Sequence, residues 1–498
     1  MNNNYYHIFN YKTINDSVYG NIGLSKIEVE LLDTRAMQRL RRIRQMGFSS
    51  YVFPDGEHSR FAHSLGVLYI MGRFCDVLYR NNEISLEDVQ LLRIAALLHD
   101  VGHYPFSHLC ETVYSYIDAK NNSILENEPF RTISLLSDLS NHIKRKTVDH
   151  EHLGANVIIY DKQINDILKA NNIDAELVGK IITGEIGVHN NSIVYVQLMH
   201  SSLDADRMDY LLRDSSQAGV VFGSVDFNYI INNIKKVKYQ LNNDNNNQYE
   251  IIAINSKAQH AVEHFLMARY FHYSQTVLHK TSLAFEAVAK TLLYKMISEE
   301  KDEFYISFDN LVKSIGSDKF YHFTDDFMWT KLKAYAKKSE DKLVKILWRT
   351  LAERKKPIII LYEKDIVLKR KSKAEKQSIN DPDFFLLKWI LERHHKEISE
   401  KCGIDMEQIG FCTSTVNIES LPSFMKIEEC NDLGEESLRD AIKLINKENK
   451  VSFLASDTTS LINKMVDYSA VSLVVFVVDP DQKIEKGKIK DVILSMIK

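Results

Sequence analysis

The amino-acid sequence predicts a mainly α-helical fold with a smaller α+β domain at the C-terminal end. Between about residues 25 and 290, apolar residues recur mostly at helical spacing. Beyond about residue 300, stretches such as KKPIIILYEKDIVLK and SAVSLVVFVVDP are β-rich instead. Since 498 residues are too many for one ordinary core, we expect a helical core domain at 1–300. Residues 301–498 are expected to form a helical extension plus the small α+β domain.

Several elements have recognisable local signals. In SLEDVQLLRIAALLHD, Ser85 and the aspartate three residues later form a capping box, which predicts a helix start. A second helix is expected to open near Ser201 or Ser202 in LMHSSLDADRMDYLLRD. Residues 261–296 carry a very long helical pattern with room for one break. The polar run LNNDNNNQ at 241–248 predicts a hairpin loop between two short strands.

Bulk composition narrows the class of protein. A hydrophobic content of 45% with 26% charged residues is typical of a soluble globular chain. The net charge of −4 gives no global electrostatic footprint for nucleic acid. Five cysteines, far apart and without a CxxC pair, indicate neither a disulfide framework nor a thiolate zinc site. The N-terminus lacks the pattern of a signal peptide and no apolar run approaches membrane-spanning length, so we expect a cytoplasmic protein without membrane contact.

The stretch LLHDVGHYPFSH at 97–108 carries the first chemical signal. An apolar helix runs directly into His99 and Asp100, and a buried carboxylate is costly unless something pairs with it. His63 and Asp206, on two other helical segments, complete a set of four candidate metal ligands. Imidazole and carboxylate ligands together suit iron, manganese or zinc, and magnesium favours the carboxylates. The sequence therefore leaves open which of these four divalent metals is bound. Taken singly, each residue is more simply a core histidine or a chance neighbour.

Long runs between residues 12 and 290 resemble the HD-domain deoxynucleoside triphosphate (dNTP) triphosphohydrolases. The matching runs are INDSVYGNIGL, LLDTRAMQRLRRIRQMG, YVFPDGEHSRFAHSLGV, LLHDVGHYPFSHL, HEHLGA and LDADRMDYLLRDS. The resemblance implies an HD-domain helical phosphohydrolase core that binds a divalent metal. The implied reaction is attack of water at the α-phosphorus of a dNTP, releasing a deoxynucleoside and inorganic triphosphate.

The resemblance also implies site roles. It makes His63, His99, Asp100 and Asp206 the metal ligands. His150 would be the acid that protonates the leaving oxygen, with His103 beside it and Glu111 orienting it, because a carboxylate raises imidazole basicity and fixes the tautomer. The neighbouring His152 leaves this assignment open by one register, and His150 could instead buttress a helix.

A triphosphate needs cationic and hydroxyl donors around the metal. The resemblance implies phosphate contacts from Arg60, His108, Arg207 and Tyr210, and contacts to the sugar 3′-hydroxyl from Gln45 and Asp214. Met46 falls where the family packs a leucine on the sugar and base. The sequence departs from the family's vertebrate member at one phosphate-binding arginine, where Ser274 or Gln275 stands, with His272 and Lys280 as nearby substitutes.

The resemblance further implies regulation by GTP or dGTP. Lys12, Asp33, Gln38 and Arg41 fall on the family's guanine-nucleotide positions, and a carboxylate can accept two donors of guanine that adenine cannot offer. In the family this nucleotide lies between subunits, so we expect a homo-oligomer, a dimer or tetramer. The plainer interpretation is a charged helix. The family's adjoining second dNTP site is not expected, because its basic positions are occupied by Tyr229, Thr281, Phe285 and Glu286.

Two other interpretations stay open. An HD-type phosphodiesterase or nucleotide phosphatase could use the same ligands and would differ in its products. Basic runs such as RRIRQ at 41–45 and LKRKSKAEK at 368–376 raise the alternative of a nucleotide-sensing or single-strand nucleic-acid-binding protein. The second run is more simply a solvated connector, and the charge balance leaves nucleic acid possible but not indicated.

Overall fold

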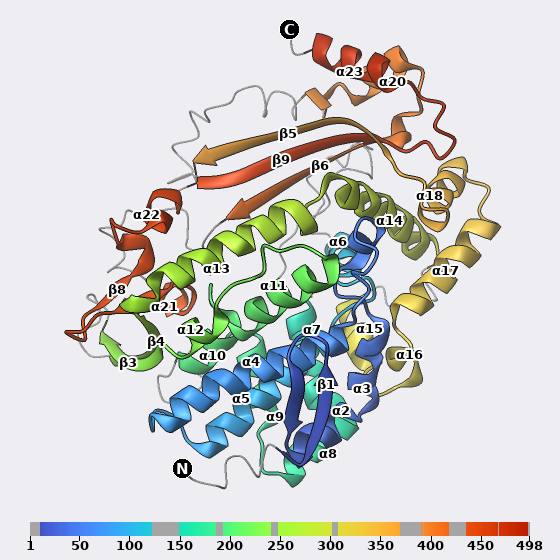
Figure 1. The fold of residues 1–498 in the computed structure, drawn as a ribbon. Coiled ribbons are helices and arrows are strands. Elements are labelled where there is room, and N and C mark those ends of the chain that lie inside the picture. Colours follow the sequence, from blue (N-terminus) through green and yellow to red (C-terminus); the bar gives the residue numbers. More distant parts are fainter. Residues whose placement is uncertain are drawn as a thin grey trace.

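A computed structural model of the chain shows a mostly helical body with three small sheets (Figure 1). The structure describes residues 10–121, 149–185, 193–240, 248–300, 307–368, 390–391, 393–417, 435–466 and 468–496. The expected mainly α-helical class with a C-terminal sheet is confirmed. The loop expected at 241–248, all but its last residue, and nearly all of the basic run at 368–376 lie outside the described residues.

The helices before residue 300 enclose the main core. They are α2 Lys26–Leu32, α3 Arg35–Arg39, α4 Arg60–Arg80, α5 Leu86–Leu98, α6 His108–Asn121, α7 His150–Tyr160, α8 Lys162–Ala170, α9 Ala175–Ile182, α10 Val194–His200, α11 Ala205–Ala218, α12 Phe227–Ile231, α13 Gln259–His272 and α14 Lys280–Glu299. Short 3-10 turns lie at Leu40–Arg42, Gly47–Tyr51 and Ser256–Ala258, and a π-helical turn at Tyr273–Val277.

Helix α4 packs in this core against α5 and α11. Among the described residues it is the one helix long and apolar enough to cross a membrane by length and composition, which the sequence analysis did not anticipate. In the structure, 72% of its most apolar window is buried inside the protein. Packing in the core therefore accounts for its apolar surface.

Local signals located some helix ends correctly and one wrongly. The capping box of Ser85 and Asp88 opens α5 as expected. The helix expected to open near Ser201 or Ser202 is instead two helices, because Ser201 is extended and Asp204 caps α11 by accepting a hydrogen bond from the Arg207 amide at 2.7 Å. The long pattern at 261–296 is broken once, as expected, by the π-helical turn between α13 and α14.

The region after residue 300 adds further helices and the C-terminal sheet. Its helices are α15 Phe308–Lys313, α16 Asp318–Tyr321, α17 Asp325–Lys338, α18 Lys342–Ala352, α20 His395–Cys402, α21 Glu435–Asp440, α22 Leu461–Met465 and α23 Lys486–Ser495. Short 3-10 turns occur at Met406–Gln408 and Leu454–Ser456.

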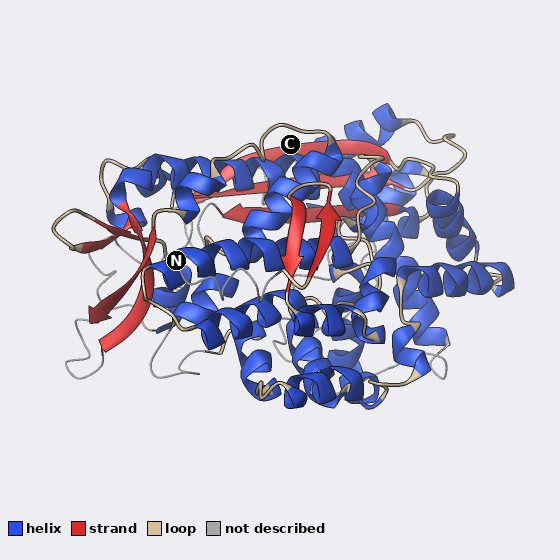
Figure 2. Ribbon diagram, turned by 60° about the horizontal axis from the view of Figure 1, so that its bottom comes forward, coloured by secondary structure: helices blue, strands red, loops and turns tan. Residues whose placement is uncertain are grey.

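Three antiparallel strands form the C-terminal sheet in the order β5-β9-β6, with bounds β5 Ile358–Leu368, β6 Ile409–Asn417 and β9 Tyr468–Val477. The two β-rich stretches singled out in the sequence are β5 and β9, and they pair with each other. One face of the sheet packs on α14, and α20 and α23 contribute to a smaller core on the other. Figure 2 shows this sheet as a layer along one side of the helical body.

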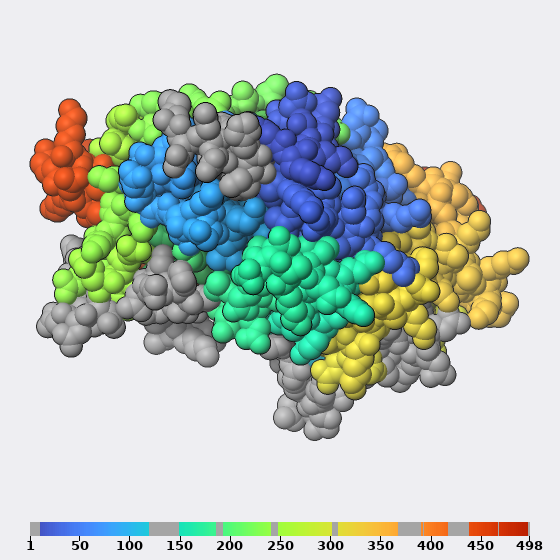
Figure 3. Space-filling model, turned by 90° about the horizontal axis from the view of Figure 1, so that it is seen from below, coloured from blue at the N-terminus to red at the C-terminus, as the bar shows by residue number. Residues whose placement is uncertain are grey.

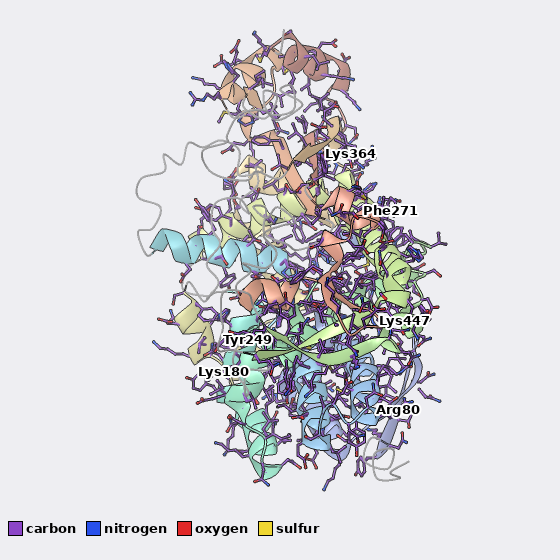
Figure 4. The ribbon with its side chains drawn as sticks, turned by 90° about the vertical axis from the view of Figure 1, so that its left-hand side faces the viewer. Arg80, Lys180, Tyr249, Phe271, Lys364 and Lys447 are labelled. Carbon is purple, nitrogen blue, oxygen red and sulfur yellow. The ribbon has the colours of Figure 1, made fainter. Side chains whose placement is uncertain are left out.

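A second sheet joins distant parts of the chain. Strands β3 Ile234–Gln240 and β4 Gln248–Asn255 form the expected hairpin, and the short strands β7 Lys443–Ile445 and β8 Val451–Phe453 extend it. The β4–β7 pairing is parallel. The side view in Figure 4 places Tyr249 of β4 well below Lys364 of β5. The division into 1–300 and 301–498 stays a prediction, although residues from both sides share this sheet and one core.

Candidate metal centre and catalytic cavity

The four predicted metal ligands stand at the ends of three helices. Ser59 caps α4, which places His63 in its first turn; His99 is the C-cap residue directly after α5, and Asp206 lies in the first turn of α11. The ligand atoms of His63, His99 and Asp206 all lie within 4.8 Å of one another. Asp100 closes the group, since its two oxygens lie 3.4 Å from His99 Nε2 and 3.8 Å from His63 Nε2.

The rings of His63 and His99 are each held at Nδ1, the nitrogen that faces away from the ligand group. His63 Nδ1 lies 2.7 Å from Asp209 Oδ2, and His99 Nδ1 lies 2.8 Å from the Ala96 carbonyl oxygen. These contacts direct both Nε2 atoms toward the carboxylates. His99 Nε2 is buried without a hydrogen-bond partner in the described part of the chain. Histidines held through Nδ1 with Nε2 facing inward are the usual arrangement of imidazole metal ligands, so the residues present fit a divalent metal.

The charge states of the two carboxyls and of His99 also fit a cation, whereas, against the effect of burial, Asp206 and Asp209 raise the pKa of His63 to about 10, so a bound metal must displace its proton. Burial alone would raise the pKa of Asp100 and of Asp206, but neighbouring cationic groups, Arg60 first for Asp100 and His63 first for Asp206, lower the pKa of both well below its usual value. Both carboxyls are therefore ionised at neutral pH. Burial lowers the pKa of His99, which favours the neutral imidazole that coordinates metals.

A second group of side chains lies beside the ligands. His150, the first residue of α7, has its Nδ1 3.1 Å from Glu111 Oε2, and the same oxygen lies 3.2 Å from His108 Nδ1. His103 is fully buried and stacks on His150 with ring centroids 4.1 Å apart. A Cβ at Gly102 would lie 2.1 Å from the backbone nitrogen of Gly154, so the glycine lets α7 approach the HDVGH turn closely.

The Glu111 carboxylate determines the charge of His150. Burial disfavours the imidazolium, yet Glu111 outweighs burial and raises the pKa of His150 to about 9. Glu111 is itself ionised, since His150 and His108 lower its pKa against the effect of burial. His152, the alternative of the sequence analysis, pairs with Asp149 at 2.7 Å and does not line the cavity described below. The geometry therefore favours His150 over His152.

The three histidines of this second group are themselves close. The ligand-type atoms of His103, His108 and His150 all lie within 4.8 Å of one another, as in the first group. His103 Nε2 lies 3.7 Å from Asp100 Oδ1, so the two groups adjoin at that carboxylate.

One cavity of about 530 Å³ opens onto both groups. Its wall contains His99, Asp100 and Asp206 of the ligand set, together with His150. It also contains every residue assigned to substrate by resemblance: Gln45, Arg60, His108, Arg207, Tyr210 and Asp214. Arg60 donates to Asp100 Oδ2 at 2.8 Å and to Ser107 Oγ at 2.9 Å, and Arg207 is paired with Asp204.

Asp214 is held by two histidines that the sequence analysis did not assign to it. His58 Nε2 lies 2.9 Å from Asp214 Oδ1, and His272 Nε2 lies 3.1 Å from Asp214 Oδ2. Tyr210 stacks on His272 with ring centroids 5.5 Å apart. Burial would raise the pKa of Asp214, but the two histidines lower it well below its usual value. Asp214 is therefore an ionised acceptor fixed in the cavity wall.

The vertebrate family member has a phosphate-binding arginine that this chain lacks, and none of the residues suggested to replace it places a free cation in the cavity. Gln275 is exposed and Lys280 faces the Tyr362 ring at 5.3 Å, and neither lines the cavity. His272 lines it but is engaged with Asp214. Helix α14 contributes a cation that sequence reasoning missed, since the half-buried Lys290 lies in the cavity wall.

The four residues assigned to a guanine nucleotide lie outside this cavity. Lys12 is exposed on strand β1, Lys12–Asp16, and Asp33 is exposed at the end of α2. Gln38 and Arg41 are in contact, with Arg41 Nε donating to Gln38 Oε1 at 2.8 Å, and the Arg41 guanidinium lies over the Phe61 ring. The nucleotide role of all four residues stays a prediction.

Comparisons with known proteins show which family and which proteins this chain is similar to. Residues 60–211 match the HD domain family. An uncharacterized protein of Mycoplasma genitalium is 34% identical over 259 residues, which are 52% of this chain and 53% of that protein. The deoxynucleoside triphosphate triphosphohydrolase SAMHD1 of Homo sapiens is 45% identical over 106 residues, which are 21% of this chain and 17% of that protein. The chain thus spans about half the length of the uncharacterized relatives that it matches.

Solved structures extend the likeness to nearly the whole chain. The crystal structure of a phosphohydrolase from Bacteroides thetaiotaomicron superposes with a TM-score of 0.62 at 22% identity, covering 93% of this chain and 99% of that one. At this identity the likeness shows a shared fold. The matched family segment, 60–211, contains all four predicted ligands and the His150–Glu111 pair. Residues 60–211 are therefore an HD domain, and its His/Asp cluster has the composition of a divalent-metal site.

Proposed function

We propose that this chain is a metal-dependent phosphohydrolase that cleaves dNTPs into a deoxynucleoside and inorganic triphosphate. The observation that carries the proposal is one cavity in which a His/Asp ligand group, the Glu111-paired His150 and the histidine-held Asp214 meet. Any one of these features occurs in other kinds of site. Together they supply a metal site, a proton donor and a hydroxyl acceptor at one place.

His63, His99, Asp100 and Asp206 would hold the metal, which when bound activates water and stabilises the charge that develops on the phosphate. The oxygen of water forms a bond to the α-phosphorus while the bond to the sugar O5′ breaks. The departing O5′ needs a proton, and His150 donates it. With a pKa of about 9, His150 carries that proton at neutral pH.

Substrate binding is proposed to use charge and one hydroxyl contact. Arg60 and Arg207 line the cavity and can turn toward phosphate oxygens, which compete with Asp100 and Asp204 for them. Lys290 adds a cation to the cavity wall, and it forms no ion pair within the described part of the chain. Both oxygens of Asp214 are held by histidines. A sugar 3′-hydroxyl that donates a hydrogen bond to this rigid carboxylate leaves little room for a 2′-hydroxyl beside it.

A second candidate function is hydrolysis of a phosphodiester or a nucleotide monophosphate. It is favoured by the second histidine group, His103, His108 and His150, whose atoms are spaced as ligands for another metal ion next to Asp100. Two-metal sites are common in phosphatases and nucleases. In that case His150 would be a ligand instead of the proton donor, and the protein would bind two metal ions.

Product analysis separates the two functions. The full chain, loaded with Fe²⁺, Mn²⁺, Zn²⁺ or Mg²⁺, is incubated with each dNTP alone and with the four mixed, and the products are resolved by chromatography. Deoxynucleoside and intact triphosphate in equal amounts are expected. Orthophosphate, or cleavage of a dinucleotide without dNTP hydrolysis, would contradict the proposal, and metal analysis counts the ions bound.

Regulation belongs to the same proposal. Binding of GTP or dGTP through Lys12, Asp33, Gln38 and Arg41 would favour a homo-oligomer and raise activity, because a ligand that binds the assembled form stabilises it by mass action. We propose a cytoplasmic enzyme without membrane partners.

A further inference from the structure

Three charged side chains form a buried series behind the metal ligand His63. Asp209 Oδ2 lies 2.7 Å from His63 Nδ1. Arg213, one turn further along α11, donates from Nε to Asp209 Oδ2 at 2.9 Å and from Nη2 to Asp209 Oδ1 at 3.1 Å. The same guanidinium reaches Asp16, with Nη1 at 2.9 Å from Oδ2 and Nη2 at 3.3 Å from Oδ1. Asp209, Arg213 and Asp16 are all buried.

The far end of the series belongs to the N-terminal hairpin, strands β1 Lys12–Asp16 and β2 Gly20–Leu24. Asp16 Oδ1 accepts hydrogen bonds from the backbone amides of Val18 and Tyr19 at 2.9 and 3.0 Å, so the turn of the hairpin fixes this carboxylate. Tyr19 stacks on Tyr69 of α4 with ring centroids 4.5 Å apart. The hairpin region, dark blue in Figure 3, lies at the molecular surface. A surface element is thus tied to a buried metal ligand.

The neighbouring helix leaves space for this series. A Cβ at Gly66, one turn after His63, would lie 1.9 Å from Asp209 Oδ1 and 2.3 Å from Arg213 Nη2. Both contacts are far shorter than any side chain tolerates. The glycine therefore lets the charged groups of α11 pack directly on the backbone of α4, next to the ligand they support.

The arrangement controls orientation more than charge. A guanidinium bound to a carboxylate through two nitrogens fixes the plane of that carboxylate, which a lysine cannot do. Asp16 holds the guanidinium, the guanidinium holds Asp209, and Asp209 sets the ring orientation and tautomer of His63. We infer that Asp209, Arg213 and Asp16 are positioning residues for His63, and that the N-terminal hairpin is thereby part of the support of the metal site. The inference rests on the proposed metal site and is independent of the proposed substrate.

A second buried ion pair provides a matched control. Arg93 Nε and Nη2 bind Glu28 Oε1 and Oε2 at 2.7 and 2.9 Å, and Arg93 also donates to the Gly23 carbonyl of the hairpin at 2.9 Å. This pair is also buried and also touches the hairpin, and the hydrogen bonds just given reach none of the four ligands. Weakening it tests the effect of losing a buried charge pair near the hairpin without reaching His63.

The experiment measures metal affinity in the full chain. Wild type, Asp16→Asn, Arg213→Lys and the control Glu28→Gln are stripped of metal and titrated with Zn²⁺ and with Mn²⁺ against a competing chromophoric chelator, and the Tm of each metal-free protein is recorded. We expect a 10- to 100-fold weaker Kd for Asp16→Asn and Arg213→Lys, the usual effect of losing an outer partner of a ligand. Glu28→Gln should lower the Tm and leave the Kd within about twofold of wild type.

Two outcomes overturn the inference. A Kd within twofold of wild type for Asp16→Asn would show that the hairpin contact is only structural. If Asp16→Asn has no cooperative unfolding transition, Arg213→Lys decides by the same criterion, because it keeps the charge and removes the two-nitrogen geometry. A wild-type protein that binds metal but hydrolyses no dNTP would refute the proposed function and leave this inference intact.

Discussion

Replacing Glu111 with glutamine should change the pH dependence of hydrolysis. Glu111 is the group that keeps His150 protonated, since it overcomes burial and raises the pKa of His150 from 6.5 to about 9. A carboxamide can still hydrogen-bond the ring but carries no charge. Asp100, Glu151, His103 and His108 continue to face His150 in the variant, so only the Glu111 charge is removed.

The size of the effect follows from the two pKa values. A change in the pKa of His150 from 6.5 to about 9 corresponds to roughly 3 kcal/mol in favour of the imidazolium. Without the Glu111 charge, the main effect that opposes burial is gone, so the pKa of His150 falls toward 6.5. If it falls to 6.5, the protonated fraction at pH 8 drops from about nine-tenths to about three hundredths, a loss of up to roughly 30-fold in the rate that depends on the acid. At pH 6 the loss should be much smaller.

The assay is the pH profile of kcat for dATP, with Asp149→Asn as the control. Asp149 pairs with His152, a neighbouring histidine–carboxylate pair outside the cavity, so its removal should leave the alkaline limb near pH 9. The same linkage acts on stability. The contribution of the raised His150 pKa is complete below pH 6.5 and is lost as the pH rises through about 9, and the contribution of the lowered Glu111 pKa is complete above about pH 4.5 and is lost as the pH falls. A Glu111→Gln enzyme whose alkaline limb stays near 9, or whose loss is equal at pH 6 and 8, would refute the assignment of His150 as the acid.

The remaining predictions concern the metal, the acid, the sugar and the activator. His99→Ala should abolish transition-metal binding and activity together, and full metal occupancy of this variant by elemental analysis would refute the ligand assignment. His150→Ala should retain the metal and lose about 10²–10⁴-fold in turnover, whereas His152→Ala should remain near wild type; the reverse order would show that the register is wrong. Wild type should hydrolyse dATP far faster than ATP, and Asp214→Asn should narrow that ratio; equal wild-type rates on both nucleotides speak against the sugar contact. GTP or dGTP should stimulate dATP hydrolysis and raise the mass seen by light scattering, and Asp33→Ala should remove both effects; an unstimulated wild type would end the activator proposal.

Parts of the fold governed by neighbouring residues could be predicted from the sequence. The capping box at Ser85, the β3–β4 hairpin and the single break in the long C-terminal pattern of the core all depend on contacts within a few residues. The start of α11 was misplaced because Ser201 and Asp204 are both good caps by residue type; in the structure Ser201 ends α10 and Asp204 caps α11. The pairing of β4 with β7 was not predictable, since three residues of strand carry no signal for a partner so far away.

The candidate site divides in the same way. The four candidate ligands could be singled out because His99 and Asp100 are adjacent and lie in long family-like runs. Asp209 was not singled out, although it lies three residues after Asp206, because its contact with His63 depends on how α4 crosses α11. The hold of His58 and His272 on Asp214 likewise joins three distant segments. Residue type and spacing thus indicated which chemistry to expect, and tertiary packing determined which neighbours surround the candidate residues.

The parallel pairing of β4 with β7 has a consequence for the order of folding. The contact joins residues 254 and 444, so the chain must close a very long loop before the sheet is complete, and such contacts form late. During synthesis the helices of the HD domain emerge first, and β4 waits with only β3 beside it. An unpaired strand edge is a template for pairing with another chain. Truncation before residue 443 should therefore leave a protein that keeps every predicted metal ligand and yet is prone to aggregation during biogenesis.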